Sequence, residues 1–244
     1  LVQGLQRLEY RGYDSCGVAV HDGGLKRARS TARVAELASQ VQQDHIQGQT
    51  GIAHTRWATH GVPAVHNAHP HFSHGPGTNA SEKPGRIALV HNGIIENYAA
   101  IKAQLQSKGH VFHSQTDTEV LVHLIEDIYT HEKVSFDEAV RLALNQVHGA
   151  FAIVVISRQD PEMLVAARKG SPLVVGVGNN EFLMASDASP IIEYTKSVVY
   201  LNDSEMAIIK NRTLSIKTIT NEDKPAYVQE LDLQLEMIEK GGFE

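Results

Sequence analysis

The 244-residue sequence has little cysteine, no excess of basic charge and no long apolar run, and each shortage excludes a class of protein. Its single cysteine, Cys16, excludes a disulfide framework and indicates a reducing compartment. Lys and Arg total 22 against 28 for Asp and Glu, so a net charge of −6 gives nucleic acid or an anionic membrane no basic surface. The apolar runs at 150–156 and 172–177 are far shorter than the roughly 18 residues of a membrane span. No charged and then apolar leader opens the sequence, so we expect a cytoplasmic location without a nucleic-acid or membrane partner.

The apolar content is nevertheless sufficient for one sizeable core, because 42% of the residues are hydrophobic. Leu1, Leu5 and Leu8 share a helical face without an N-cap, which predicts the back half of a helix. The elements expected next are strands at 15–21 and 49–54, a helix at 30–41, a loop at 55–84, a strand at 86–91 and a helix capped by Asn97. A loop of roughly 30 residues inside a compact domain is usually functional.

Two capping boxes, Thr116 with Glu119 and Ser135 with Glu138, each precede a helical apolar stripe. A short helix is expected near 190–194, and strands at 149–156, 163–167, 173–177, 182–185, 198–201, 206–209 and 213–217. Residues 150–156 do not alternate in polarity, so both faces of that strand are covered, while turn-length connections favour antiparallel pairing. We therefore predict an α+β domain over 1–217, with two stacked antiparallel sheets and helices outside, followed by a polar linker over 218–244.

Polar residues gather with glycines at three predicted strand ends, at 10–15, 51–61 and 90–97. In the second segment Arg56 offers a planar fork suited to a carboxylate, and Thr59 and His60 add donors. This set can hold the carboxylate of an amino acid. Trp57 is either a lid over the site or a packing residue.

Asn92, Gly93 and Asp117 each have two interpretations. Asn92-Gly93 is either a hairpin turn or a pair of donors that stabilises the oxyanion of acyl transfer. Asp117 directly follows the Thr116 cap, where it is either a favourable charge at a helix N-terminus or the partner of an ammonium group.

Histidines are numerous and raise the alternative of a metal-binding protein. His60, His66, His69, His71 and His74 have spacings that fit no standard zinc motif, and no cysteine assists them, so we expect no metal site. Cys16 enters a predicted strand, where a small buried residue is more common than a nucleophile.

Five segments together carry a resemblance to one enzyme family: 10–15, 54–61, 91–97, 114–119 and 170–173. They are similar to the glutaminase domains of glutamine-fructose-6-phosphate aminotransferases, which are class II glutamine amidotransferases with the N-terminal-nucleophile hydrolase fold. The resemblance implies a four-layer sandwich of helix, sheet, sheet and helix. It also implies amide hydrolysis of glutamine without a cofactor, in hexosamine biosynthesis, with ammonia passing to a sugar-phosphate isomerase domain of a homodimeric full-length protein. The ending 240–244 resembles the linker before that domain.

The resemblance assigns roles to nine residues. Those expected to bind glutamine or glutamate are Arg56, Thr59 and His60 at the α-carboxylate, Asp117 at the α-ammonium and Trp57 as the gate for ammonia. Those expected to serve catalysis are Asn92 and Gly93 as the oxyanion hole, with Arg11 and Gly12 beside the nucleophile.

The nucleophile of this family is an N-terminal cysteine on the first strand, and the sequence has Leu1 at its start. The resemblance places that strand upstream of Leu1, and Cys16 cannot replace it because it has no free α-amine. Two hypotheses follow: a glutaminase whose cysteine lies outside this sequence, or a non-catalytic glutamine- or glutamate-binding module with a degenerate site.

Overall fold

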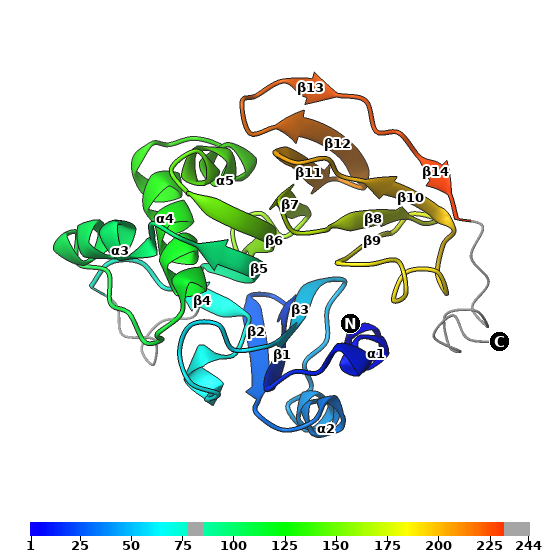
Figure 1. Ribbon diagram of the computed structural model, residues 1–244, viewed down its shortest axis with the longest axis horizontal. Coiled ribbons are helices and arrows are strands. Elements are labelled where there is room, and N and C mark those ends of the chain that lie inside the picture. Colours follow the sequence, from blue (N-terminus) through cyan, green and yellow to red (C-terminus); the bar gives the residue numbers. More distant parts are fainter. Residues whose placement is uncertain (78–84, 232–244) are drawn as a thin grey trace.

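The computed structural model describes residues 1–77 and 85–231, in which helices occur near the start and in the middle of the chain. The helices are α1 (Val2–Arg7), η1 (Glu9–Arg11), α2 (Val34–Gln43), η2 (Val65–Asn67), α3 (Tyr98–Ser107), α4 (Asp117–His131) and α5 (Phe136–Leu144) (Figure 1). The first strands are β1 (Ser15–His21), β2 (Leu25–Ser30), β3 (Thr50–Arg56), β4 (His71–Ser73), β5 (Ile87–Ile95), β6 (Gly149–Ser157) and β7 (Met163–Lys169). The last are β8 (Val174–Val177), β9 (Phe182–Ala185), β10 (Ser197–Tyr200), β11 (Glu205–Lys210), β12 (Thr213–Thr218), β13 (Asp223–Lys224) and β14 (Gln229–Glu230).

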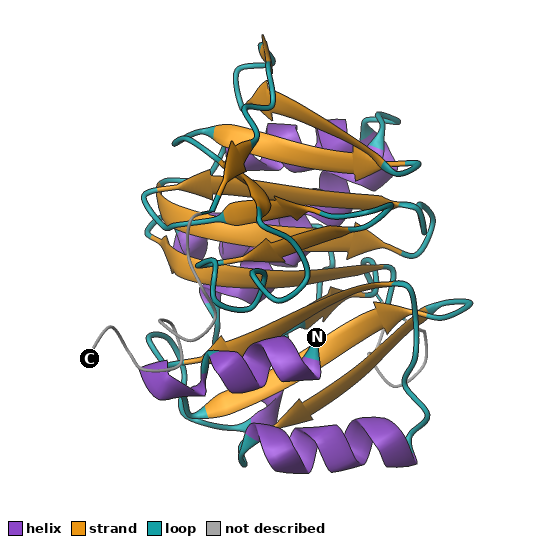
Figure 2. Ribbon diagram, turned by 90° about the vertical axis from the view of Figure 1, so that its right-hand side faces the viewer, coloured by secondary structure: helices purple, strands orange, loops and turns teal. Residues whose placement is uncertain are grey.

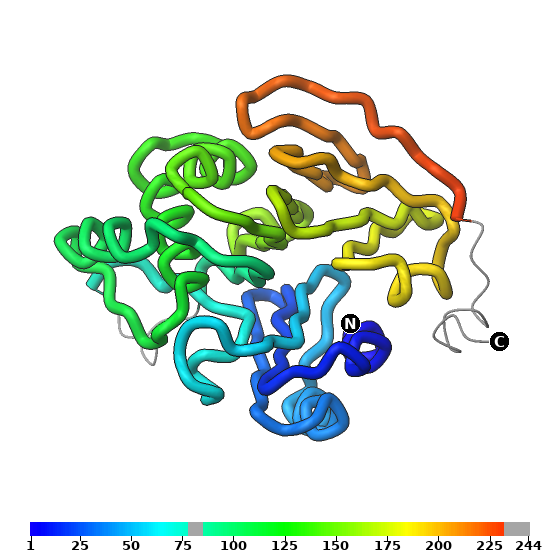
Figure 3. The backbone as a smooth tube through the Cα atoms, in the orientation of Figure 1, coloured from blue at the N-terminus to red at the C-terminus, as the bar shows by residue number. Residues whose placement is uncertain are grey.

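The strands form three sheets whose ladders are antiparallel. The large sheet has the order β13-β12-β11-β7-β6-β5-β4, the N-terminal sheet β2-β1-β3, and the four-stranded sheet β14-β10-β8-β9. Antiparallel pairing was predicted from the short connections, whereas two sheets were expected and the described residues form three. Figure 3 shows the N-terminal segments in blue below the green to red remainder of the chain.

Alternation along the central strands gives the large sheet two apolar faces. On β5, Leu89 packs with the helices α3, α4 and α5, while Val90 packs with Ile52 of the N-terminal sheet. On β6, Ile153 faces the same helices and Ala152 faces the four-stranded sheet. Burial of each large side chain on these strands stabilises the fold by about 1.5–3 kcal/mol. The non-alternating run at 150–156 therefore has both faces covered, as predicted.

Helices close the stack on its outer sides. Leu5 of α1 and Leu37 of α2 pack on Val18 of the N-terminal sheet, opposite to the face that meets the large sheet (Figure 2). The four-stranded sheet is covered outside by Ile191, which packs on Val174. The order of layers is helix, sheet, sheet, helix, which confirms the predicted α+β sandwich.

The two predicted capping boxes form only in part. Thr116 Oγ1 accepts a hydrogen bond from Glu119 N at 3.3 Å, but the Glu119 carboxylate binds Ser114 N at 2.6 Å instead of returning to the cap. Ser135 precedes α5 without a side-chain cap bond, and Glu138 pairs with Arg141 at 2.6 Å. Both helices exist as predicted, although the second box was wrong.

Other boundaries also differ from the prediction. The expected loop over 55–84 contains η2 and β4, and the expected helix near 190–194 is a pair of turns closed by Ile192 N to Ala188 O at 3.0 Å. Asn97 precedes α3 but does not cap it, because its side chain binds Gln146 O and His148 N at 2.8 and 2.9 Å. The described part of 218–244 contains β13 and β14, and the ending at 240–244 lies outside the described residues. No helix in 1–77 or 85–231 is long and apolar enough to span a membrane.

Candidate active site

A cavity of about 1300 Å³ lies between the edge strands β3 and β9. Its walls include Gly51 to Trp57 on the β3 side and Phe182 to Ser186 on the β9 side, and Ala152 and Val154 of the large sheet also line it. All nine residues with predicted roles line this cavity: Arg11, Gly12, Arg56, Trp57, Thr59, His60, Asn92, Gly93 and Asp117. Residues from four separate segments of the chain thus meet at one site.

Asp117 is the first residue of α4 and is buried, with 3% of its surface exposed. Its Oδ2 accepts a hydrogen bond from Ile95 N at 2.8 Å, which fixes the carboxylate beside the end of β5. The helix N-terminus favours negative charge at this position. A buried carboxylate at a cavity wall is suited to an ammonium group.

Arg56 ends β3 and is also buried, with its guanidinium shared between the protein and the cavity. Its Nη2 donates to the carbonyl oxygens of His60 and Gly61, the latter at 3.1 Å. Nη1 lies 3.6 Å from Asp14 Oδ1 and has no hydrogen-bond partner among the described residues. Burial lowers the pKa of Arg56, and Asp14 and Asp117 oppose that effect. One arm of the fork therefore holds the loop, while Nη1 is buried and pairs with Asp14.

The loop after Arg56 is anchored by Asp14. Asp14 N donates to Arg56 O at 2.8 Å, and its Oδ2 accepts a hydrogen bond from Ala58 N. Trp57 is 68% exposed, so it is not a core residue, and its ring lies over Gly12, where an added Cβ would be 3.0 Å away. Gly12 has a φ of +75°, which favours glycine, and the absence of a Cβ also leaves room for the Trp57 ring.

Asn92 and Gly93 lie inside strand β5, opposite Ala152 and Phe151, so the hairpin-turn interpretation is wrong. Gly93 has a φ of +141°, and a Cβ there would be 2.1 Å from Ala150 O. The Asn92 side chain is exposed at the cavity wall. The pair therefore lies within β5 beside the cavity, where the resemblance leads us to expect donors for an oxyanion.

Arg11 turns toward the segment that follows β9. Its Nη1 donates to Ser186 Oγ at 2.8 Å, and Nη2 forms an ion pair with Asp187. A parallel contact joins Arg7 of α1 to Glu193 at 2.8 Å. Arg11 thus links the N-terminal helices to the far wall of the cavity, in addition to lining it.

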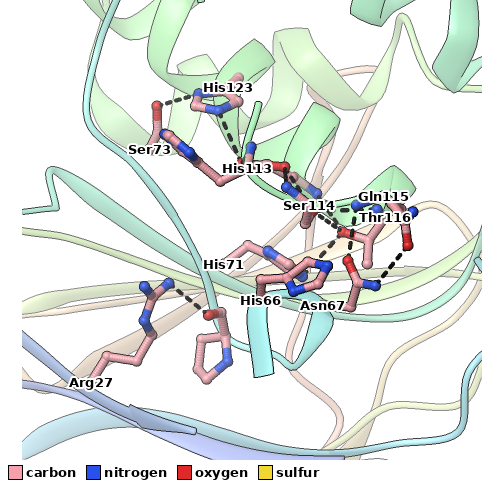
Figure 4. A network of polar contacts seen from close by, with 12 residues as sticks. Arg27, His66, Asn67, His71, Ser73, His113, Ser114, Gln115, Thr116 and His123 are labelled. Carbon is pink, nitrogen blue, oxygen red and sulfur yellow. Dashed lines mark hydrogen bonds and ion pairs between the residues drawn. The ribbon is translucent and has the colours of Figure 1, made fainter. Parts of the chain in front are cut away.

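A network of buried polar side chains extends from Thr116 at the cavity wall, and Figure 4 shows the part that includes His71, Ser73 and His123. Thr116 Oγ1 is 3.1 Å from His71 Nε2, Ser73 Oγ is 2.9 Å from His123 Nδ1, and His91 Nδ1 is 3.1 Å from Thr118 Oγ1. Burial, followed by neighbouring positive groups, lowers the pKa of His54 to about 3. Burial also holds the pKa values of His69 and His71 well below 6.5. His54, His69 and His71 are therefore neutral at neutral pH.

Two further hypotheses from the sequence concerned a metal site and a nucleophilic Cys16. In the part of the chain that the structure describes, no three His, Cys, Asp or Glu side chains come together as metal ligands. Cys16 is fully buried, with its Sγ 3.7 Å from Ala32 O, and burial raises the pKa of its thiol to about 11. Cys16 does not line the cavity, so it is a packing residue.

Sequence reasoning missed Asp14, Asn67 and Gln115, which hold the loop and the start of α4 in place. Asp14 stood within the segment 10–15, so its position beside Arg11 was a usable signal. Gln115 likewise stood within the segment 114–119, whereas Asn67 had no signal, because its contact with Gln115 joins residues 48 positions apart.

A sandwich of this layer order, with polar side chains gathered beside a cavity at the edges of its sheets, is typical of the class of N-terminal-nucleophile amidotransferases. Among solved structures, glutamine phosphoribosylpyrophosphate amidotransferase from B. subtilis matches 89% of this chain with a TM-score of 0.74 and 24% identity, over 46% of its own length. A glutamine aminotransferase class-II domain protein from Silicibacter pomeroyi matches 84% of this chain and 91% of its own, with a TM-score of 0.56 and 17% identity. These likenesses confirm the fold.

The chain belongs to the glutamine amidotransferase domain family, whose sequence profile matches residues 71–193, just over half of the 244. Among curated proteins it is 52% identical over its whole length to glutamine–fructose-6-phosphate aminotransferase (isomerizing) from Chlorobaculum tepidum. The protein of the same name from Bacteroides thetaiotaomicron is 51% identical, and that from Pyrococcus horikoshii 43%. The chain spans about two fifths of these relatives, 39% of the first two and 40% of the third.

Proposed function

We propose that the natural protein to which this chain belongs hydrolyses the amide of glutamine at this site, and that the ammonia is used to convert fructose 6-phosphate into glucosamine 6-phosphate. The observation that carries the proposal is the cavity between β3 and β9, whose wall combines the guanidinium of Arg56 with the buried carboxylate of Asp117. An amino acid carries both complementary charges. The names of the relatives supply the acceptor sugar phosphate.

In the proposed reaction, a cysteine thiol at the N-terminus of the natural protein attacks the side-chain amide carbon of glutamine. Its own α-amine takes the thiol proton, the carbonyl oxygen becomes an oxyanion held by Asn92 and Gly93, and ammonia leaves with that proton. A γ-glutamyl thioester results, and water then cleaves its C–S bond to give glutamate and the free thiol. Arg56, Thr59 and His60 hold the α-carboxylate, and Asp117 holds the α-ammonium.

The place proposed for the cysteine is a strand between β3 and β9. Both are edge strands within residues 1–77 and 85–231, and the cavity separates them above an apolar floor that includes Ala152 and Val154. A strand in this position would join the N-terminal and four-stranded sheets into one layer. Its end would lie beside Arg11, Gly12 and Trp57 at the cavity wall.

The rest of the proposal concerns the whole protein. We assign residues 1–217 to the glutaminase domain and residues 218–244 to a connecting segment. We assign the part of the relatives that lies beyond the region matched by this chain to a sugar-phosphate isomerase domain. We place the protein in the cytoplasm, which agrees with a single buried cysteine. Trp57, exposed on the cavity wall, would guide ammonia toward the isomerase domain of a homodimer.

The deciding experiment measures glutamate and ammonia produced from L-glutamine by the natural full-length protein. Equal amounts of the two products, and loss of both after treatment with a chloroketone analogue of glutamine, are expected. The analogue forms a C–S bond with the N-terminal thiol and releases chloride, while the buried Cys16 stays unmodified in peptide mass spectra. Glutamate binding without hydrolysis, despite a verified N-terminal cysteine, would instead identify a non-catalytic binding module.

A further inference from the structure

Asn67 is fully buried at the end of η2, and its side-chain amide is shared between two segments of the chain. Its Oδ1 accepts a hydrogen bond from Gln115 N at 2.9 Å, and its Nδ2 donates to Gln115 Oε1 at 3.1 Å. The same Nδ2 donates to Val62 O at 3.0 Å. Both N–H groups and the oxygen of the Asn67 amide therefore have hydrogen-bond partners.

One side of this contact is the loop that follows Arg56. Gln115 Oε1 also accepts from Val62 N at 3.4 Å, so both main-chain groups of Val62 are held. Arg56 Nη2 binds the carbonyl oxygen of Gly61 at 3.1 Å, and a Cβ on Gly61 would be 2.7 Å from Asn67 Nδ2. The loop carrying Thr59 and His60 is therefore closed at both ends by side-chain hydrogen bonds.

The other side of the contact is the start of α4. Gln115 directly precedes the cap Thr116, and Asp117 is the first helical residue. Asp117 is in turn bonded to Ile95 N at 2.8 Å. A shift of the main chain at Gln115 therefore moves the carboxylate of Asp117 relative to the loop.

We propose that Asn67 and Gln115 form a clamp that sets the distance between the carboxylate-binding loop and Asp117, and so selects ligands that carry both an α-carboxylate and an α-ammonium group. Neither residue lines the cavity, so both are positioning residues. The inference rests on the proposed function, since it concerns recognition of glutamine and glutamate at the same site. It adds a source of specificity remote from the ligand.

The test compares L-glutamate with glutarate, which lacks the α-ammonium, as ligands of the natural full-length protein measured by titration calorimetry. Asn67→Ala removes three hydrogen bonds, and we expect L-glutamate to bind about 10-fold more weakly or worse. Glutarate, which does not need Asp117, should lose less affinity, so the preference for glutamate falls. In steady-state kinetics the KM for glutamine rises by a similar factor while kcat stays within about two-fold.

Two further variants separate positioning from folding. Asn145→Ala is the matched control, because Asn145 also donates its side-chain amide to two carbonyl groups, Arg141 O at 3.0 Å and Ile219 O at 2.8 Å, away from the cavity. It should leave both affinities unchanged. Gln115→Ala removes only the exposed half of the clamp, so it tests the proposal even where Asn67→Ala folds poorly. We expect it to lower the glutamate preference in the same direction, with less than additive effects in the double variant.

An unchanged ratio of glutamate to glutarate affinity in both Asn67→Ala and Gln115→Ala, with normal wild-type binding, would overturn the clamp and leave the proposed function intact. If the wild-type protein binds neither glutamine nor glutamate, the proposed function fails, and the clamp's role in recognition fails with it.

Discussion

Single residues at this site support the fold and face the cavity at once. Asp117 holds Ile95 N, and Arg56 holds two carbonyl groups of its own loop, before either meets a ligand. A simple deletion of either side chain therefore disturbs structure and recognition together. Variants that keep the shape and remove one property separate the two effects.

Asp117→Asn keeps an oxygen that can accept from Ile95 N but removes the negative charge. We expect binding of L-glutamate to weaken by about 2 kcal/mol, or some 30-fold, because a charged partner of the ammonium is lost. Thermal unfolding should change little. Asp117→Ala should weaken binding as much and also lower the unfolding temperature, since the buried Ile95 N–H loses its acceptor. Unchanged glutamate affinity in both variants, measured by calorimetry, would refute the ammonium role.

A second prediction concerns Gly93, which has a positive φ and lies close to the main chain of Ala150. Gly93→Ala places a Cβ 2.1 Å from Ala150 O at a φ of +141°, so we expect a loss of at least about 2 kcal/mol in the free energy of unfolding. Gly23→Ala is the control, because Gly23 has a φ of +61° and an added Cβ there would meet nothing within 4 Å. It should lose about 1 kcal/mol from backbone strain alone. Equal urea-unfolding midpoints for the two variants would show that the contact with Ala150 relaxes without cost.

At the scale of elements, α4 is central to the candidate site, because Thr116 caps it and its first residue, Asp117, lines the cavity. Thr116 bonds Glu119 N and His71 Nε2, so the cap also ties α4 to β4. Ser135 occupies the same position before α5 without a side-chain bond. Two N-caps of similar sequence thus have different structural roles.

The two caps give a matched pair of variants. Thr116→Ala should lower the free energy of unfolding by about 1–2 kcal/mol, because a cap bond and a buried contact are lost together. Ser135→Ala should lower it by less than about 0.5 kcal/mol, since that side chain makes no cap bond. Chemical denaturation measures both, and an equal loss in the two variants would contradict the role given to the Thr116 cap.

The elements that could be predicted from sequence are those specified by local pattern. The helix α4 has an apolar stripe and a cap within one segment, and β6 has a continuous apolar run. The strand status of Asn92-Gly93 could not be predicted, because an Asn-Gly pair locally favours a turn and its partner Phe151 lies 58 residues later. The same holds for β4, a strand of three residues with two polar side chains.

The candidate site shows the same division. Arg56 at the end of β3 and Asp117 at the start of α4 could be named from local sequence and family resemblance, and the structure places both on one cavity. Asn67 could not, since its hydrogen bonds to Gln115 exist only after the loop has folded onto α4. The hydrogen bonds from Arg56 Nη2 to its own loop could not be predicted either, because they depend on the main-chain conformation at His60 and Gly61.

At the scale of the whole molecule, the interface between the sheets contains several neutral histidines. His54 and His69 stack with ring centroids 4.4 Å apart, and His69 lies 5.1 Å from His71. Their folded pKa values lie below the unfolded value of about 6.5. The unfolded chain therefore binds protons that the folded chain does not, once the pH falls below about 6.5.

We expect stability to be complete above pH 6.5 and to fall as the pH drops toward 3, the pKa of His54. Each such histidine contributes at most about 1.4 kcal/mol per pH unit well below 6.5. Below pH 4.5, loss of the Glu119 carboxylate, whose pKa is lowered to about 2, adds to the effect. Urea midpoints at pH 7.5, 6.5 and 5.5 measure the slope, which His54→Phe should reduce. A flat profile between pH 7.5 and 5.5 would contradict the neutral state of these rings.

The facing edges of β3 and β9 also determine which amides exchange with solvent. On an edge strand, alternate N–H groups point away from the ladder, and here they border the cavity instead of another strand. Those amides should exchange hydrogen for deuterium rapidly, whereas the central strands β5 and β6 exchange slowly. A strand between the two edges would protect alternate amides on both at once, while an amino acid would protect a few beside Arg56. The pattern of exchange along β3 and β9 therefore distinguishes a chain segment from a small ligand as the occupant of this cavity.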